Sequence, residues 1–253
     1  MPIDSRRIAL KLRTSSLQAP AEIARCFARV RELGFEQLEL GGLPALEPAE
    51  LRQLANDAGL KILAVHQDPA ELVEQPGQVA DRLAALGCRL AVYSRPHLPL
   101  ATLDEVLELA DALSRAGETL RSRGRLLTYH NHALEFRKLG SKAILDWLYE
   151  RADPFMVHAE LDTYFVQLGG GDPAAYCARL SGRLPLLRVK DYAVDSQSVP
   201  KPAPLGDGNL NFPVILREAE AAACEHYVIE HDSTADDDDF AAAAKSLSYL
   251  KSL

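Results

Sequence analysis

The chain has 253 residues, of which 47% are hydrophobic and 25% charged, the composition of an ordinary soluble globular protein. The formal net charge is -8 with no basic run, which excludes nucleic acid as the main partner, because phosphate binding needs clustered Lys and Arg. The four cysteines form no CxxC pair, so we expect reduced thiols. No apolar run approaches the roughly 18 residues of a membrane helix, and the N-terminus lacks the apolar core of a signal peptide. These features predict a cytoplasmic protein without a membrane partner.

The first half of the chain alternates short apolar runs with segments in which apolar residues recur at helical spacing. Proline at a helix start, as at Pro20, and glycine at a helix end, as at Gly34, mark the boundaries. The expected strands cover residues 8–12, 37–40, 61–66 and 89–93. The expected helices cover residues 20–33, 47–58 and 103–116, and a helical region from 68 to 86 breaks near Pro76-Gly77.

The second half repeats this alternation, with a proline-rich loop expected over residues 199–210. The expected strands cover residues 125–131, 155–161, 186–190 and 227–230, and the expected helices cover 142–150, 174–180, 213–223 and 240–250. Eight strand–helix units without a composition shift predict an α/β fold, a single (β/α)8 TIM barrel formed by one domain over residues 1–253. The dinucleotide fingerprint of an open doubly wound sheet is absent after the first strand. In such a barrel the active site lies at the carboxyl ends of the strands.

Several expected strands end in titratable residues at that position. His130 and His132 share a face with Thr128, because side chains alternate along a strand. Asp162 and Glu230 end two further strands and could ligate a hard or borderline divalent cation or transfer protons. Alternatively, each carboxylate could pair with a nearby Arg or Lys and only seal the top of the barrel. Together with the histidines, these carboxylates favour a functional site.

The histidines differ in their expected roles. His130 could ligate a metal ion or act as a base near neutral pH, and the alternative is a core histidine bonded to a carbonyl group. His132 and Glu135 lie further along and could orient the groups that contact a ligand. His66 and Glu39 end the third and second strands and face the same mouth, where they could bind substrate. Three histidines are expected outside the site, in a loop or near strand starts: His97, His158 and His226.

Three further features carry less specific signals. Lys190 could hold a substrate oxygen or an enediolate charge. Alternatively, it could form a salt bridge with Asp162 or with Glu160. Glu160 is itself a candidate for substrate binding. The Gly206-Asp207-Gly208 segment could aim backbone N–H groups at a ligand anion, although a plain turn is the simpler interpretation. The acidic run at 236–239 resembles a metal cluster, but the helix dipole favours acidic residues at a helix start, and we expect that role here.

Five motifs carry a resemblance to a known family: Tyr-His-Asn-His-x-x-Glu-Phe at 129–136, Glu-Leu-Asp-Thr at 160–163, Val-Lys-Asp at 189–191, Leu-Gly-Asp-Gly at 205–208 and Ile-Glu-His-Asp at 229–232. With them the chain resembles the xylose-isomerase-like TIM barrels, described broadly as sugar phosphate isomerases and epimerases, and among these the Tyr-His-Asn-His subgroup. The resemblance runs through nearly the whole chain in the right order. It is specific for the fold and loose for the reaction, because members include isomerases, epimerases, inositol-pathway dehydratases and DNA-repair endonucleases.

The resemblance implies a divalent metal ion (Mn, Mg, Co or Zn) held by side chains of the fifth to eighth strands. Asp162 and Glu230 match two of the usual ligands, and His130 stands where many members have glutamate. Arg188 occupies the position of the usual histidine ligand, and arginine cannot lose its proton to ligate a cation. Either Asp162, Glu230 and His130 keep the metal, with water or a neighbouring side chain as a further ligand, or Arg188 replaces the metal as a permanent positive charge.

The first functional hypothesis is a sugar or keto-sugar isomerase or epimerase that acts through an enediolate. The metal, or Arg188 with Lys190, would polarise the carbonyl group, and Glu230 and His130 would transfer protons at the adjacent carbon. One alternative is a lyase that resembles inosose dehydratase, and another is a metal-free barrel that binds a sugar without turning it over. The acidic charge disfavours an endonuclease. The resemblance leaves the assembly open, with a homodimer among the expected forms.

Overall fold

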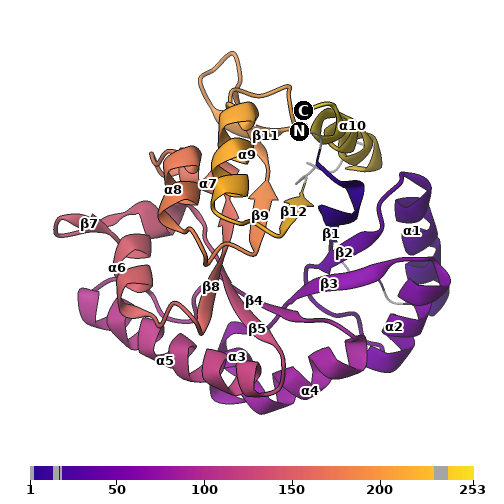
Figure 1. Cartoon of the computed structure of the whole chain (residues 1–253), viewed down its shortest axis with the longest axis horizontal. Coiled ribbons are helices and arrows are strands. Elements are labelled where there is room, and N and C mark those ends of the chain that lie inside the picture. The colour runs from indigo at the N-terminus through magenta and orange to yellow at the C-terminus, as the bar shows by residue number, and fades with distance from the viewer. Residues whose placement is uncertain (1–2, 14–16, 18, 231–238) are drawn as a thin grey trace.

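The computed structural model describes residues 3–13, 17, 19–230 and 239–253, which form a closed barrel of eight parallel strands (Figure 1). Neighbouring strands follow the order β1-β12-β9-β8-β5-β4-β3-β2, and the pairing of β1 with β2 closes the ring. The predicted fold class, a (β/α)8 barrel, is confirmed. The barrel strands are β1 (Ile8–Leu12), β2 (Gln37–Leu40), β3 (Lys61–His66), β4 (Leu90–Ser94), β5 (Leu126–His130), β8 (Val157–Asp162), β9 (Leu186–Val189) and β12 (His226–Ile229).

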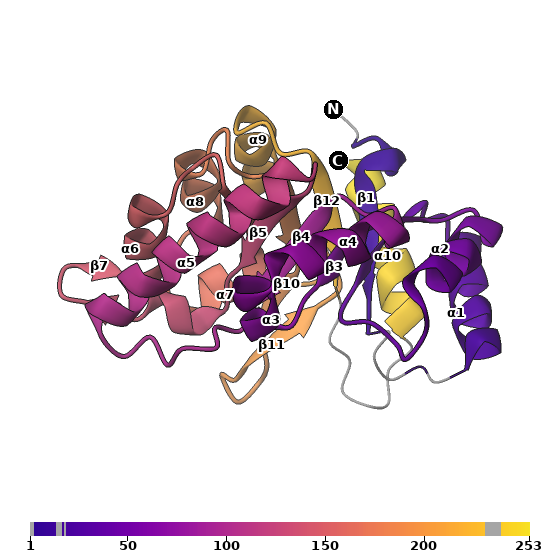
Figure 2. The same ribbon diagram turned by 90° about the horizontal axis from the view of Figure 1, so that it is seen from below.

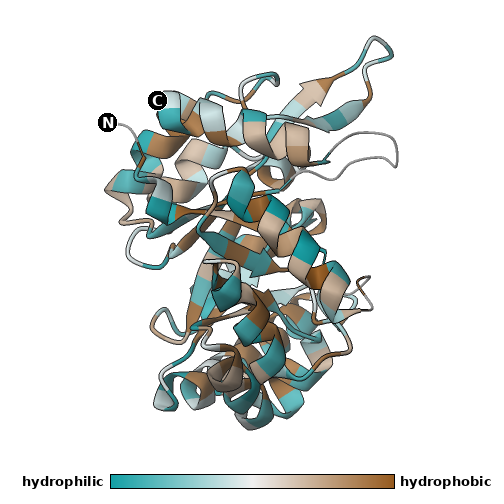
Figure 3. Cartoon of the chain, turned by 90° about the vertical axis from the view of Figure 1, so that its right-hand side faces the viewer, coloured by the Kyte–Doolittle hydropathy of each residue, from teal (hydrophilic) through white to brown (hydrophobic). Residues whose placement is uncertain are grey.

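The α-helices cover the outside of the barrel (Figures 1 and 2). Six of them have proline in their first two positions, where the missing N–H has no partner to lose. Hydrophilic and hydrophobic residues alternate along their ribbons (Figure 3), as expected for helices that pack one face on a barrel. No helix in the described ranges has both the length and the apolar character to cross a membrane. The helices are α1 (Pro20–Glu32), α2 (Pro48–Asp57), α3 (Pro69–Glu74), α4 (Pro76–Leu86), α5 (Leu103–Ser122), α6 (Ile144–Arg151), α7 (Thr163–Leu168), α8 (Pro173–Arg179), α9 (Phe212–Ala221) and α10 (Asp239–Ser252).

The predicted bounds of the first three strands agree with the structure residue for residue, whereas the helix expected to end at residue 116 is longer. This helix, α5, continues through Gly117 to Ser122. A Cβ at Gly117 would overlap the backbone carbonyl of Met156, so this glycine permits close packing of α5 against the segment before β8. The predicted end at residue 116 was wrong, because Gly117 lies inside this helix and does not end it.

Two hairpins outside the barrel were not predicted. β10 (Asp191–Val194) and β11 (Pro200–Ala203) pair antiparallel, and the hairpin projects from the lower edge in Figure 2. Only β11 lies within the stretch expected as a proline-rich loop. Proline is tolerated there because a two-stranded sheet has edges that need no N–H donor. β6 (Lys138–Leu139) and β7 (Lys142–Ala143) form the second hairpin, so the helix expected from residue 142 begins only at Ile144.

Alternation along the strands separates two apolar cores. Outward side chains join those of the helices in one large buried cluster, and inward side chains form a small cluster inside the barrel. The inner cluster consists of Ala9, Ala64, Leu90, Val92, Leu186 and Val228. Two residues further along the same strands, the inward positions become polar, as at Lys11, His66, Arg188 and Glu230. The inner apolar cluster therefore lies beneath a layer of polar side chains at the carboxyl ends of the strands, the end of the barrel called the mouth here.

Candidate active site

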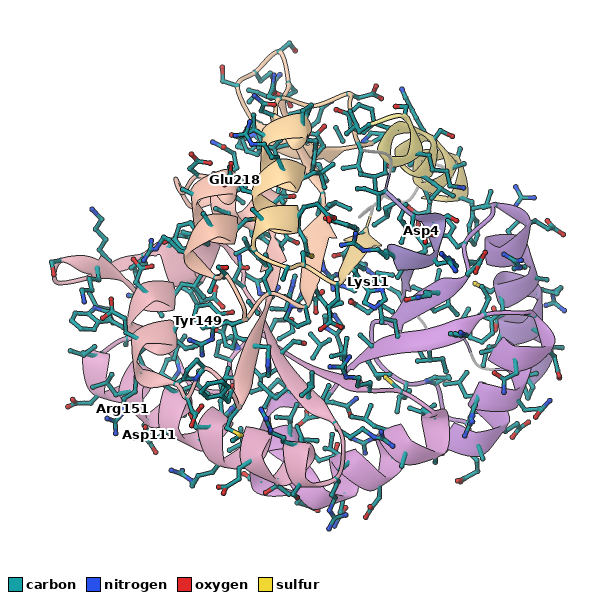
Figure 4. The ribbon with its side chains drawn as sticks, viewed as in Figure 1. Asp4, Lys11, Asp111, Tyr149, Arg151 and Glu218 are labelled. Carbon is teal, nitrogen blue, oxygen red and sulfur yellow. The ribbon has the colours of Figure 1, made fainter. Side chains whose placement is uncertain are left out.

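The barrel mouth brings together polar side chains from adjacent strands. Strand register pairs Lys11 with Glu39, His130 with Glu160, and Asp162 with Arg188. Glu230 directly follows β12, and Lys11 lies inside the ring of strands, close to β12 (Figure 4). The structure thus brings together the four residues predicted to converge, which are His130, Asp162, Arg188 and Glu230.

Arg188 is fully buried at the centre of this cluster. Its Nε donates to Oε1 of Glu160 at 2.9 Å, and its Nη2 donates to the same oxygen and to Oε1 of Glu39. Its Nη1 donates to Oε2 of Glu230. Three carboxylates therefore surround one guanidinium group, and hydrogen bonds between two ionised groups are stronger than neutral ones.

Glu230 lies between two cations, because Lys11 Nζ donates to its Oε1 at 2.6 Å while Arg188 donates to its Oε2. Burial alone would raise the pKa of Glu230, but Arg188 and Lys11 outweigh it and hold this pKa well below its usual value. The side chains of Lys11 and Glu230 remain 13% and 9% exposed, so a ligand entering the mouth can reach both. Lys11 was missed as a site residue, although its place two residues after the inward Ala9 on β1 is a signal for it.

Glu160 and Asp162 are fully buried on β8. Burial raises the pKa of Glu160 to about 7 against the opposing charge of Arg188, and raises the pKa of Asp162 to about 7 against Lys190 and Arg188. Asp162 Oδ1 accepts a hydrogen bond from the N–H of Phe165 at 2.9 Å and so caps α7. Its Oδ2 has no hydrogen-bond partner among the described residues. Both carboxyl groups can therefore hold or release a proton near neutral pH.

His66, His130 and His132 form a row of rings at the mouth, with centroid separations of 5.6 Å for the first pair and 4.9 Å for the second. Burial, reinforced by nearby positive charge, lowers the pKa of His66 to about 3, that of His132 to about 4, and that of His130 well below its usual value. All three rings are therefore neutral near pH 7. His66 Nε2 lies 2.8 Å from Glu39 Oε1 and 3.1 Å from Arg188 Nη2, so it can donate to the first or accept from the second.

Lys190 is buried beside two aromatic rings. Its Nζ lies 5.2 Å from the ring centroid of Tyr164 and 5.1 Å from that of Phe165, within cation–π range. Its charge also lowers the pKa of Asp162, in opposition to burial. Lys190 therefore favours the ionised form of Asp162, one of the two residues expected to pair with it.

The Gly206-Asp207-Gly208 turn binds an anion that the chain itself supplies. Asp191 Oδ2 accepts hydrogen bonds from the N–H groups of Gly206 and Gly208, each at 3.0 Å, and its Oδ1 accepts one from Leu210 at 3.1 Å. A Cβ at Gly208 would overlap the Asp191 carboxylate, so glycine is required there. These N–H groups bind Asp191 rather than a ligand anion, and the plain turn is the correct interpretation.

Glu135 fixes the loop after β5. Its Oε1 accepts a hydrogen bond from the Tyr129 hydroxyl at 2.8 Å, and its Oε2 accepts one from the N–H of His132 at 3.0 Å. Burial raises the pKa of Glu135, and the hydrogen bond from Tyr129 opposes the rise. Through these two contacts Glu135 holds His132 at the mouth.

The histidines expected outside the site lie away from it. His97 follows β4 in a bend, where its Nδ1 is 2.8 Å from the Tyr93 hydroxyl. His158 and His226 lie at the amino-terminal ends of β8 and β12, opposite the mouth. Of the acidic run, residues 236–238 lie outside the described residues, and Asp239 begins α10.

The donor atoms at the mouth can be tested against a divalent metal ion. Within the described ranges, Glu39, His66 and Glu160 form a group with metal-binding chemistry, and their ligand atoms lie within 4.8 Å of one another. However, Arg188 Nη2 contacts one possible ligand atom of each of these residues, namely Glu39 Oε1, His66 Nε2 and Glu160 Oε1. Both oxygens of Glu230, a predicted ligand, are likewise bonded to cationic side chains. With Arg188 in this position, the residues do not fit a divalent cation.

A closed eight-stranded barrel with titratable side chains at the carboxyl ends of its strands is the arrangement on which TIM-barrel active sites are built. The sequence profile of the family described as "Xylose isomerase-like TIM barrel" matches residues 27–253. The chain belongs to this family, as the motifs predicted.

Solved structures share the fold at low sequence identity. A sugar phosphate isomerase/epimerase from Parabacteroides distasonis has a TM-score of 0.83 and 23% identity, over 98% of this chain and 94% of that one. An L-ribulose 3-epimerase has a TM-score of 0.73 and 18% identity, over 96% and 93% of the two chains. A xylose isomerase-like TIM barrel protein from Mycobacterium smegmatis, solved in complex with magnesium, has a TM-score of 0.75 and 16% identity, over 97% and 95%.

One similar protein of known function is an inosose dehydratase from Geobacillus kaustophilus, 26% identical over 191 residues. The match covers 66% of this chain and 61% of the dehydratase, so it spans about three fifths of that protein. These similarities show the shared barrel fold and leave the reaction to the chemistry of the mouth.

Proposed function

We propose that this chain is a sugar or keto-sugar isomerase or epimerase that acts through an enediolate. The proposal is carried by one observation, the Glu230 carboxylate held between Lys11 and Arg188 at the mouth, where 9% of its side chain is exposed. Removing a proton next to a carbonyl group needs a base beside a positive charge that receives the developing oxyanion. Glu230 supplies the base, and Lys11, which donates a hydrogen bond to it, supplies the positive charge.

In the proposed mechanism, Lys11 turns its hydrogen bond from Glu230 toward the carbonyl oxygen of the substrate. Loss of this partner raises the pKa of Glu230 from its depressed value, so Glu230 becomes a better base when the substrate is bound. Arg188 is a positioning residue, because its donors are directed at carboxylates. Asp162, with a pKa of about 7, suits the second proton transfer better than His130, whose lowered pKa keeps it neutral.

The proposal is tested by incubating the protein in D2O with a panel of aldoses and ketoses, each with and without a phosphate group. Deuterium at the carbon beside the carbonyl, detected by NMR, reports proton abstraction even when little product accumulates. Glu230→Gln is expected to slow this exchange by about 10²–10⁴-fold, the usual contribution of a proton-transfer group, while the barrel stays folded. Near-normal exchange in that variant would reject Glu230 as the base.

The matched control is Glu225→Gln, the same substitution in an exposed ion pair with Arg89 just before β12, at the other end of the barrel. It should leave exchange unchanged. Ligand binding without exchange across the panel would reject catalysis and favour the third hypothesis, a barrel that binds a sugar without turning it over. The pairing of Arg188 with three carboxylates is the observation that favours that hypothesis.

A lyase is the second candidate, favoured by the similarity to inosose dehydratase. The same polarised carbonyl would acidify the adjacent C–H, and the enediolate would then expel a β-hydroxyl group. A product lighter by one water, detected by mass spectrometry, identifies this reaction. A role in carbohydrate metabolism, a cytoplasmic location, a single domain over residues 1–253 and a homodimer stay predictions.

A further inference from the structure

The position that a cation would take at the mouth is occupied by a nitrogen atom of the chain. Glu39 Oε1, His66 Nε2 and Glu160 Oε1 come from β2, β3 and β8 and point at a common centre. Arg188 Nη2 reaches this centre from β9, donating to both carboxylates and lying 3.1 Å from the imidazole nitrogen. The guanidinium group therefore has the neighbours that a bound metal ion would have.

We infer that the guanidinium group of Arg188 permanently takes the place of a divalent cation, so that the native chain binds no such cation at its mouth. Arginine keeps its proton under all ordinary conditions and offers its donors in a rigid plane that matches carboxylate oxygens. It supplies the positive charge that holds the carboxylates together. Unlike a metal ion, it has no ligand position to exchange with a substrate oxygen.

Space and charge both oppose a metal ion beside Arg188. The Arg188 side chain is fully buried, so Nη2 has no solvent-filled space at its present position into which it could withdraw. Two further cations lie nearby, because Lys11 bonds to Glu230 and Lys190 acts on Asp162. A divalent ion would have to compete with these cations for the same carboxylates. The site therefore already holds three cations of its own among four carboxyl groups.

The same geometry predicts that one substitution creates a metal site. In Arg188→His the guanidinium group leaves the centre, and an imidazole can join Glu39, His66 and Glu160 as a fourth ligand. Two imidazoles and two carboxylates form a ligand set suited to Zn²⁺ or Mn²⁺. Mn²⁺ is expected to bind this variant on the order of 100-fold more tightly than the native chain, because the repulsion by a like charge is gone.

The test is metal content, measured by plasma mass spectrometry after the folded proteins are incubated with MnCl2 or ZnCl2 and desalted. The native chain is expected to carry well below one equivalent, and neither Mn²⁺ nor EDTA should shift its thermal unfolding. Arg188→His should carry about one equivalent and be stabilised by Mn²⁺. The control is Arg217→His, which adds a histidine on the exposed face of α9 beside Glu218 and should behave like the native chain.

One equivalent of metal in the native chain, together with destabilisation by EDTA, would overturn the inference. A folded Arg188→His that binds no more metal than Arg217→His would also overturn it, because the centre would then not be a cation position. If Arg188→His fails to fold, the measurements on the native chain still decide. What this inference implies for catalysis rests on the proposed function. Metal content is measured without a substrate, so the inference and the proposed function can each be refuted separately.

Discussion

Replacing Arg188 with methionine removes the guanidinium group and keeps an unbranched side chain of similar length. The carboxyl groups of Glu39 and Glu160, both fully buried, then lose their cationic partner, and Glu230 keeps only Lys11. Breaking a buried ion pair by removing one partner costs about 3–5 kcal/mol, because an uncompensated charge remains. Since a domain of ordinary stability unfolds with about 5–15 kcal/mol, Arg188→Met should fold only marginally near neutral pH.

The loss should depend on pH in a defined direction. Without Arg188, burial raises the pKa of Glu160 further, so the folded variant holds protons that the unfolded chain releases. A carboxyl group whose folded-state pKa is raised contributes stability at low pH and loses it as the pH rises through that pKa. The difference in unfolding free energy between the native chain and Arg188→Met should therefore be smaller at about pH 5 than at about pH 8.

Urea unfolding followed by circular dichroism at the two pH values measures this difference. Arg151→Met is the matched control, because Arg151 forms an exposed pair with Asp111 at 2.7 Å, on the outer edge of the molecule in Figure 4. It should leave the unfolding free energy nearly unchanged at either pH, because an exposed ion pair contributes little to stability. Adding Glu160→Gln to Arg188→Met should restore part of the stability at the higher pH. A loss as small as that of the control, or one equal at both pH values, would refute this account of Arg188.

Two further substitutions test the groups around this cluster. In Asp162→Asn, the fall in unfolding free energy between about pH 5 and about pH 8 should be smaller than in the native chain, because a carboxyl group with its pKa raised to about 7 is removed; a steeper fall would contradict the assignment. Asp191→Ala leaves the N–H groups of Gly206, Gly208 and Leu210 without their acceptor, at a cost of about 1–3 kcal/mol for each that stays buried. It should lower the thermal midpoint and speed proteolysis in residues 195–210, and an unchanged midpoint with unchanged proteolysis would show that Asp191 does not hold this turn.

Local sequence patterns were sufficient to predict the barrel and most of its mouth. A short apolar run bounded by proline or glycine is a local signal, so the bounds of β1, β2 and β3 were predicted residue for residue. Alternation along a strand then fixes which side chains face inward, and this placed His130 and Asp162 on the mouth side of their strands. Compared with the ligand set that the family resemblance implies, the identity of Arg188 also indicated that one usual ligand is missing.

The contacts that decide the chemistry of the site were beyond prediction because they are not local. Arg188 and Glu39 are separated by 149 positions in the chain, and nothing near either residue indicates that they meet. The pKa values of Glu160 and Asp162 depend on complete burial, which arises only when the ring of strands closes. Strand register and burial therefore determine which carboxyl group stays ionised and which can hold a proton near neutral pH.

Two local signals were present in the sequence and were not used. Asp162 is followed three positions later by Phe165, whose N–H it caps, and this spacing is typical of a helix start. Helix α7 was not predicted, because it is short and follows β8 without a break. Asp162 has a structural role as its cap besides its place at the mouth. Lys11 was missed because a lysine on a first strand matches no motif for metal or acid–base chemistry.

Of these two missed features, Lys11 matters more for the proposed reaction than helix α7. If Arg188 replaces the metal ion, its three nitrogen atoms each bond a carboxylate and its side chain is fully buried, so the guanidinium group fixes Glu39, Glu160 and Glu230 and lies away from a substrate oxygen. A metal ion would both organise the carboxylates and bind the substrate. Under the proposed function the two tasks are divided in this chain, and the second requires a cation that is partly exposed and can change partners. Lys11, bonded to Glu230 and 13% exposed, meets both conditions, so turnover should depend on Lys11 and Glu230 as a pair.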